Sequence, residues 1–144
     1  MVGFTITELV TVLIIAGVIA AVALPRFAAT TYGEDELRLY DQTFAALRYA
    51  QRVATTMQRN VCVTFTSTQL SLTYGSTYGG ACNTGLAGPG GESAPYTVSA
   101  QGSASYTSAS TFSYDRVGRP SPSQTITISG GKQIAVEPET GYVH

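Results

Sequence analysis

Charged side chains are scarce in this chain. Asp, Glu, Lys and Arg make up 12% of its 144 residues, and the formal net charge is −1. Globular domains usually carry about twice that share of charge. A nucleic-acid-binding protein needs a basic face, so this composition disfavours that class. Ser, Thr, Gly, Gln and Tyr must cover most of the surface, which favours an exported, packed or assembled protein.

Histidine is nearly absent as well. The single histidine, His144, is the last residue of the sequence. A Ser/His/Asp or Cys/His arrangement in a rigid core therefore has no histidine available. We expect a protein that is not an enzyme, and no motif in the sequence indicates a cofactor.

One acid interrupts a long apolar run near the start of the chain. Between Phe4 and Leu24 the only charged residue is Glu8, and no Lys or Arg precedes Arg26. A helix over residues 4–24 would be about 31 Å long, close to the roughly 30 Å core of a bilayer. A carboxylate in hydrocarbon costs a few kcal/mol, so Glu8 needs a partner or a function.

Three interpretations of this stretch are open. It is a plain membrane anchor, or it is a secretory signal peptide with an A-x-A-like site at Ala21 and Ala23, or Gly3 and Phe4 form a processing junction. The region MVGFTITE has no basic residue and contains an acid, which disfavours a signal peptide. The third interpretation makes Glu8 the fifth residue of the mature chain.

The segment GFTITELVTVLIIAGVIAAVALPRF resembles the type IV prepilin signature, because glycine, phenylalanine, acid and proline stand at the family's spacing. The resemblance implies that a prepilin peptidase cuts after Gly3 and methylates Phe4, and that Pro25 kinks the helix. Thr7 departs from the usual Ile or Leu, and the leader is shorter and less basic than is common in the family.

The resemblance also suggests a partner for Glu8. Cleavage would place an α-amine on Phe4, and in a filament Glu8 of one subunit can meet Phe4 of its neighbour. A dry ion pair is costly to leave half-made, so the pair would set the register between subunits. The simpler hypothesis is that Glu8 reaches the headgroup layer.

The prepilin resemblance divides the chain into a leader at 1–3, a transmembrane and filament-core helix at 4–25, and a periplasmic globular domain at 26–144.

The middle of the chain narrows the resemblance. LRYAQRVATTMQRNVCVTF resembles the helix-to-strand junction of GspH/FimT-like minor pseudopilins and pilins, and FSYDRVGRP and ETGYV resemble their late strands. This implies a structural minor pilin or pseudopilin that enters or primes a fibre, of a mannose-sensitive haemagglutinin pilus rather than a type II secretion system. The competing hypothesis is a pilus-associated module that binds DNA or surface glycans through its loops.

The same resemblance implies the partners and the location of the chain. The partners would be other pilin subunits, the prepilin peptidase and an inner-membrane assembly platform. The chain would cross the inner membrane once, with its C-terminal domain in the periplasm, until assembly moves it into an extracellular or periplasmic fibre.

The sequence predicts a helix that continues past the apolar run. Pro25 and Gly33 are expected to kink or break it, because proline removes a backbone donor. Beyond them, apolar residues recur at helical spacing over 34–59 and predict one packed stripe. The predicted stripe consists of Leu37, Tyr40, Phe44, Leu47, Ala50, Ala54 and Met57.

The rest of the chain reads as strands and loops. Alternating residues predict one hairpin over 61–66 and 69–74 and another over 125–129 and 133–137. Weaker strands are expected at 96–99, 105–108 and 111–115, with loops at 75–95 and 115–123. The predicted fold class is therefore α+β, a type IV pilin fold in which a long N-terminal helix packs on a small, mostly antiparallel sheet.

Four further sets of residues are candidates for special chemistry. Cys62 and Cys82 are expected to form a disulfide in an exported domain, and two free thiols are the alternative. Asp115, Glu137 and Glu139 lack the spacing of a calcium loop, so we expect a solvated surface and no metal. DNA binding is not expected from the two arginines of the second loop, and sugar stacking by loop tyrosines is a weaker hypothesis still. The residues concerned are Arg116 and Arg119, and Tyr74, Tyr78 and Tyr96.

Overall fold

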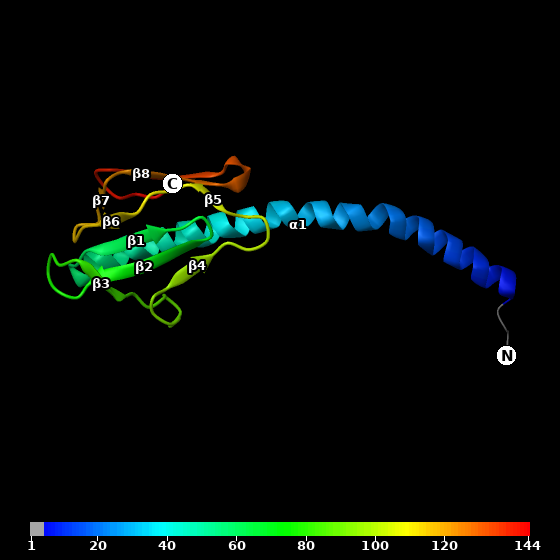
Figure 1. Cartoon of the computed structure of the whole chain (residues 1–144), viewed down its shortest axis with the longest axis horizontal. Helices are drawn as coiled ribbons and strands as arrows, with labels where there is room; N and C mark the ends of the chain where they lie inside the picture. Colours follow the sequence, from blue (N-terminus) through cyan, green and yellow to red (C-terminus); the bar gives the residue numbers. More distant parts are fainter. Residues whose placement is uncertain (1–4) are drawn as a thin grey trace. The chain divides into compact units, whose positions relative to one another are not determined.

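The computed structural model describes the backbone of residues 5–144, with side chains for 5–22 and 33–144. The chain divides after Glu34 into two compact units, and the helix α1 (Ile6–Met57) belongs to both (Figure 1). The backbone is helical through Pro25 and Gly33, so the predicted break is absent, and the predicted kink stays a prediction. A proline deletes one helical hydrogen bond, and the remaining bonds of the helix carry it past that position.

The described side chains of the first unit are all exposed. They include the large apolar residues of the run that surrounds Glu8, among them Leu9, Val12 and Ile15. The second unit, Asp35–His144, contains the hydrophobic core.

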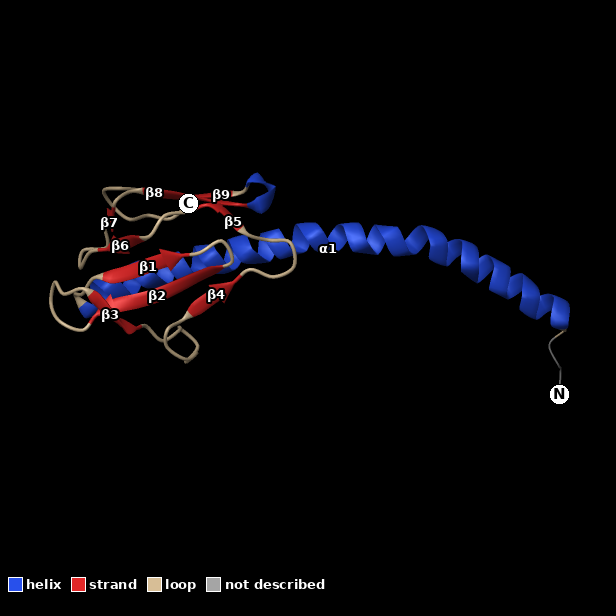
Figure 2. Ribbon diagram, in the orientation of Figure 1, coloured by secondary structure: helices blue, strands red, loops and turns tan. Residues whose placement is uncertain are grey.

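Two antiparallel sheets build the second unit together with the C-terminal half of α1 (Figure 2). The larger sheet has the order β3-β2-β1-β6-β7, with β4 also paired to β2, and the smaller has the order β5-β8-β9. The strands are β1 (Val61–Phe65), β2 (Gln69–Gly75), β3 (Cys82–Gly85), β4 (Thr97–Ser99), β5 (Tyr106–Ser108), β6 (Phe112–Tyr114), β7 (Pro120–Ser121), β8 (Gln124–Ile128) and β9 (Gln133–Val136).

Both predicted hairpins are confirmed. In the first, Val61 of β1 pairs with Tyr74 of β2, and in the second β8 pairs with β9 across the short 3-10 turn Ser129–Gly131. The alpha+beta fold class is confirmed with them. Two strands lie where loops were expected: β3 within 75–95 and β7 within 115–123.

The packed face of α1 differs from the predicted stripe. Leu47, Ala50 and Ala54 are buried as expected, but Leu37 and Met57 are 47% and 45% exposed. The prediction favoured large side chains, whereas the face that enters the core is built mostly from small ones, which let the helix approach the sheet closely. The buried residues on this face are Leu39, Thr43, Ala46, Leu47, Ala50 and Ala54.

Two tyrosines reach the core with their hydroxyl groups in different situations. The hydroxyl of Tyr106 lies 2.7 Å from Thr43 Oγ1, and both residues are buried. Tyr114 is fully buried, and its hydroxyl finds no hydrogen-bond partner among the described residues. An unpaired buried hydroxyl costs about 1–3 kcal/mol, so only the Tyr106 hydroxyl is well accommodated.

Candidate assembly site and surface sites

Glu8 lies in the first turn of α1, and Thr5, three residues before it, caps the helix. The Glu8 backbone N–H donates to the Thr5 carbonyl oxygen at 3.1 Å and to Thr5 Oγ1 at 3.3 Å. The pattern T-x-x-E is that of a capping box, and an acid in the first turn is favoured by the helix dipole. Thr5 was not expected to take part, although this motif in the sequence indicates it.

The surroundings of the Glu8 side chain are apolar. Leu9, Val12 and Leu13 form a shallow hollow beside it. Within the described parts of the chain, the only ion pair joins His144 to Glu137, so Glu8 has no cationic partner there. Gly3 and Phe4 lie outside the described residues, and the expected contact between Glu8 and Phe4 stays a prediction. Where side chains are described, no helix is both long enough and apolar enough to cross a membrane.

The structure joins Cys62 and Cys82 in a disulfide, with their Cα atoms 6.0 Å apart. Cys62 lies in β1 and Cys82 begins β3, and both strands pair with β2. The bond therefore fixes Cys82, within the predicted loop 75–95, to the central strand β1 of the larger sheet.

Two of the three carboxylates considered for calcium make separate contacts. Asp115 Oδ1 accepts hydrogen bonds from the backbone N–H groups of Val117 and Arg119, at 2.9 and 2.8 Å, and so holds its own turn. Glu137 Oε1 lies 3.0 Å from His144 Nε2. In the part of the chain that the structure describes, no three His, Cys, Asp or Glu residues are grouped as metal ligands.

The loop arginines and tyrosines are only partly brought together. The Arg116 guanidinium lies 4.9 Å from the centre of the exposed Tyr78 ring. Arg119 makes its contact through the backbone, to Asp115. Neither DNA binding nor sugar stacking is tested by this arrangement.

A groove between α1 and the edge of the larger sheet holds another of the predicted tyrosines. It has a volume of about 480 Å³, and Tyr74 lines it together with Tyr49 and Arg52 of α1. Tyr96 packs edge-on against Tyr49, with ring centres 6.3 Å apart. Burial raises the pKa of Tyr96, and the nearby Glu92 carboxylate raises it further. Sequence reasoning missed Tyr49 and Arg52, since no motif links them to Tyr74.

Comparison with known proteins decides the family. The chain is 30% identical over 103 residues to the type IV narrow pilus major component PilA5 of Thermus thermophilus. The match covers 69% of this chain and 88% of the relative. The chain belongs to the type IV pilins. No protein-family model and no solved structure matches it.

Membership in the type IV pilins agrees with the fold described above, a long N-terminal helix packed on antiparallel sheet. It makes the chain a structural pilus subunit, which is consistent with a protein that is not an enzyme. This comparison does not distinguish a GspH/FimT-like pilin or a haemagglutinin-pilus subunit from other type IV pilins.

Proposed function

We propose that this pilin is a minor pilin or pseudopilin that enters, or primes, a type IV pilus-like or type II secretion fibre. Residues 1–3 are the leader, the peptidase cuts after Gly3, and Phe4 becomes the methylated N-terminus. Residues 4–25 hold the chain in the inner membrane before assembly, with residues 26–144 in the periplasm. Its partners are the prepilin peptidase, the assembly platform and other pilin subunits.

The observation that carries this proposal is the environment of Glu8. The carboxylate sits among exposed apolar side chains and has no cationic partner within the described residues. Such a surface is stable only when lipid or other helices cover it. Once covered, the carboxylate is costly unless a cation joins it, and the α-amine of a neighbour's Phe4 is a cation at a matching depth.

The experiment replaces Glu8 in cells whose own copy of the gene is deleted. Glu8→Val should be processed and inserted normally, because removing a carboxylate lowers the cost of insertion. It should be depleted from sheared fibres, because the neighbouring amine is left unpaired. Glu8→Asp should be intermediate, since the charge is kept on a shorter arm. Equal recovery of Glu8→Val and wild type in fibres would refute the pairing.

A matched control and a mass measurement complete the test. Glu139→Val also removes an exposed carboxylate, but from a loop of the second unit, and should leave fibre entry unchanged. The intact mass of membrane-extracted protein should correspond to a chain that begins at methylated Phe4. A chain that begins at Leu24 would mean that the apolar run is a signal peptide.

A second candidate role is that of the repeated subunit. The relative in Thermus thermophilus is by name the major component of a narrow pilus, and the match spans 88% of it. The number of copies per fibre, measured by quantitative mass spectrometry of purified fibres, separates the two roles. A trace amount supports a minor pilin, and a dominant amount supports the repeated subunit.

A further inference from the structure

Two large apolar side chains on the packed half of α1 face solvent. Leu37 is 47% exposed and Met57 is 45% exposed. They are separated by 20 residues of helix, or about 30 Å. Both were predicted to be buried, and within one copy of the second unit neither is covered. Each is therefore a candidate for contact with another molecule.

The charges of the same helix are segregated by sign. Segment 34–41 carries four carboxylates and one arginine, whereas segment 48–59 carries three arginines and no carboxylate. Among the described residues none of these groups forms an ion pair. Arg38 donates instead to Gln101, and Arg59 to the carbonyl oxygens of Gly75 and Ser76. The described residues thus include one acidic and one basic helix segment, and no ion pair is formed by either.

Leu37 stands at the centre of the exposed acidic surface. Glu34 and Asp41 are also exposed, three residues before it and four residues after it. Residues at these spacings are neighbours on one face of a helix, so an apolar side chain lies between two carboxylates. Asp35 and Glu36 are less exposed, and their carboxylates pack against the loop residues Gly102 and Gly130.

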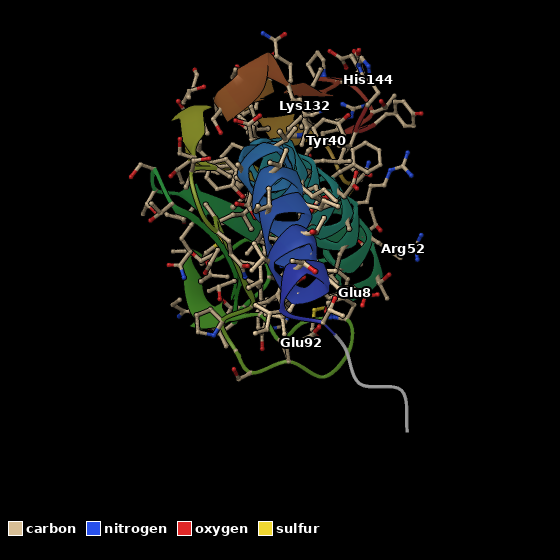
Figure 3. The ribbon with its side chains drawn as sticks, turned by 90° about the vertical axis from the view of Figure 1, so that its right-hand side faces the viewer. Glu8, Tyr40, Arg52, Glu92, Lys132 and His144 are labelled. Atoms are coloured by element: carbon tan, nitrogen blue, oxygen red, sulfur yellow. A yellow bond between two sulfur atoms is a disulfide. The ribbon has the colours of Figure 1, made fainter. Side chains whose placement is uncertain are left out.

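The basic segment borders an apolar groove that could accept Leu37 and its flanking carboxylates. The groove of about 480 Å³ is lined largely by apolar groups, including Val53, Met57 and Leu86. Arg52 is the only charged residue of its lining, and Figure 3 shows its side chain projecting outward from the helix. An apolar side chain flanked by carboxylates would fill such a groove and neutralise the arginine at its rim.

We propose that segment 34–41 of one copy docks in this groove of a second copy. Leu37 enters the groove beside Met57, and Glu34 or Asp41 meets Arg52. The proposal rests on the second candidate role, that of the repeated subunit, because a fibre built from that subunit holds copies of the chain side by side. At 100° per residue, Leu37 and the groove lie on faces of α1 roughly 120° apart. The contact is therefore head-to-tail, and repetition of such a contact makes an open filament.

The axial offset of this contact separates it from the Glu8 contact. Leu37 lies 16 residues before Val53, so the two copies are shifted by about 24 Å along the helix. Phe4 and Glu8 are only four residues apart in the sequence, so a pair between them needs a much smaller shift than the groove contact. We therefore assign the two contacts to different neighbours. Each subunit thus contacts a near neighbour through Glu8 and a more distant one through the groove.

The test uses full-length chains assembled into fibres. A variant carrying both Leu37→Cys and Met57→Cys has its new thiols about 30 Å apart within one chain, far beyond the reach of an internal disulfide. Oxidation of its fibres should give a ladder of covalently linked multimers. Mixed fibres of the two single variants should give dimers only. A matched pair, Leu37→Cys with Thr64→Cys, uses an exposed β1 position away from the groove and should give no ladder.

A second pair of variants avoids cysteine. Arg52→Glu should reduce fibre yield, and adding Asp41→Arg to it should restore the yield, because the reversed charges attract again. Fibres that form without a ladder overturn the inference while leaving the structural role intact. A crosslink to a different pilin also overturns it, because the occupant is then not a second copy. Absence of the wild-type chain from fibres overturns the proposed function itself.

Discussion

Tyr106 and Tyr114 allow the same substitution to be tested with opposite expected signs. Tyr106→Phe removes the 2.7 Å hydrogen bond to Thr43 and strands the hydroxyl of that buried threonine. A buried hydroxyl left without its partner costs about 1–3 kcal/mol, so we expect destabilisation of that size. Tyr114→Phe removes a buried hydroxyl that has no partner among the described residues. The free energy of unfolding should then stay unchanged or rise by about 1 kcal/mol.

The measurement is urea unfolding of the full chain in detergent, with the folded fraction read by pulse proteolysis. This readout does not depend on tyrosine spectroscopy, which both substitutions alter. The double variant Tyr106→Phe with Thr43→Val removes both hydroxyls of the pair and should be closer to wild type than Tyr106→Phe alone. Equal destabilisation by Tyr106→Phe and Tyr114→Phe would refute the argument from hydrogen bonding.

Further predictions concern pH, the disulfide and the core. Burial raises the pKa of Tyr106 from 10.0 to about 12. The stability that this tyrosine contributes should therefore be complete below about pH 10 and fall by about 1.4 kcal/mol per pH unit up to about pH 12, which urea midpoints check with Tyr106→Phe as control. Replacing Cys62 and Cys82 with alanine opens a closure of 20 residues and should cost up to about 3 kcal/mol of unfolding free energy, with unchanged stability counting against the bond. Leu47→Ala, at a position that is 0% exposed, should cost about 2–5 kcal/mol, whereas Leu37→Ala should stay within about 0.5 kcal/mol in monomeric protein.

Alternation of apolar residues within a strand predicted both hairpins of this fold. The hairpin of β1 and β2 follows from alternation at Val61 and Val63 and at Leu70 and Leu72, whose side chains are all buried. β3 could not be predicted in this way. Its sequence CNTG has no apolar alternation, and it is a strand because β2 offers its edge.

In the helix and the candidate sites, too, only the features that a local sequence pattern reveals could be predicted. Helical spacing located the packed segment of α1, but the size of side chains was a poor guide to its buried face, where Thr43 and Ala46 take part and Leu37 does not. Glu8 is conspicuous in the sequence because it is the one charge of an apolar run. The sequence did not predict the groove, because Tyr49 and Tyr74 come together only once the sheet has packed on the helix.

The bond between β1 and β3 has a mechanical consequence. When tension unfolds a subunit from its two ends, the segment between Cys62 and Cys82 cannot lengthen, because the disulfide carries the load past it. Its 20 residues would otherwise extend to about 70 Å. With the two Cα atoms held 6.0 Å apart, about 65 Å of that extension is withheld. An oxidised subunit in a stretched fibre thus reaches its limit of elongation earlier than a reduced one, and the strain passes sooner to the contacts between subunits.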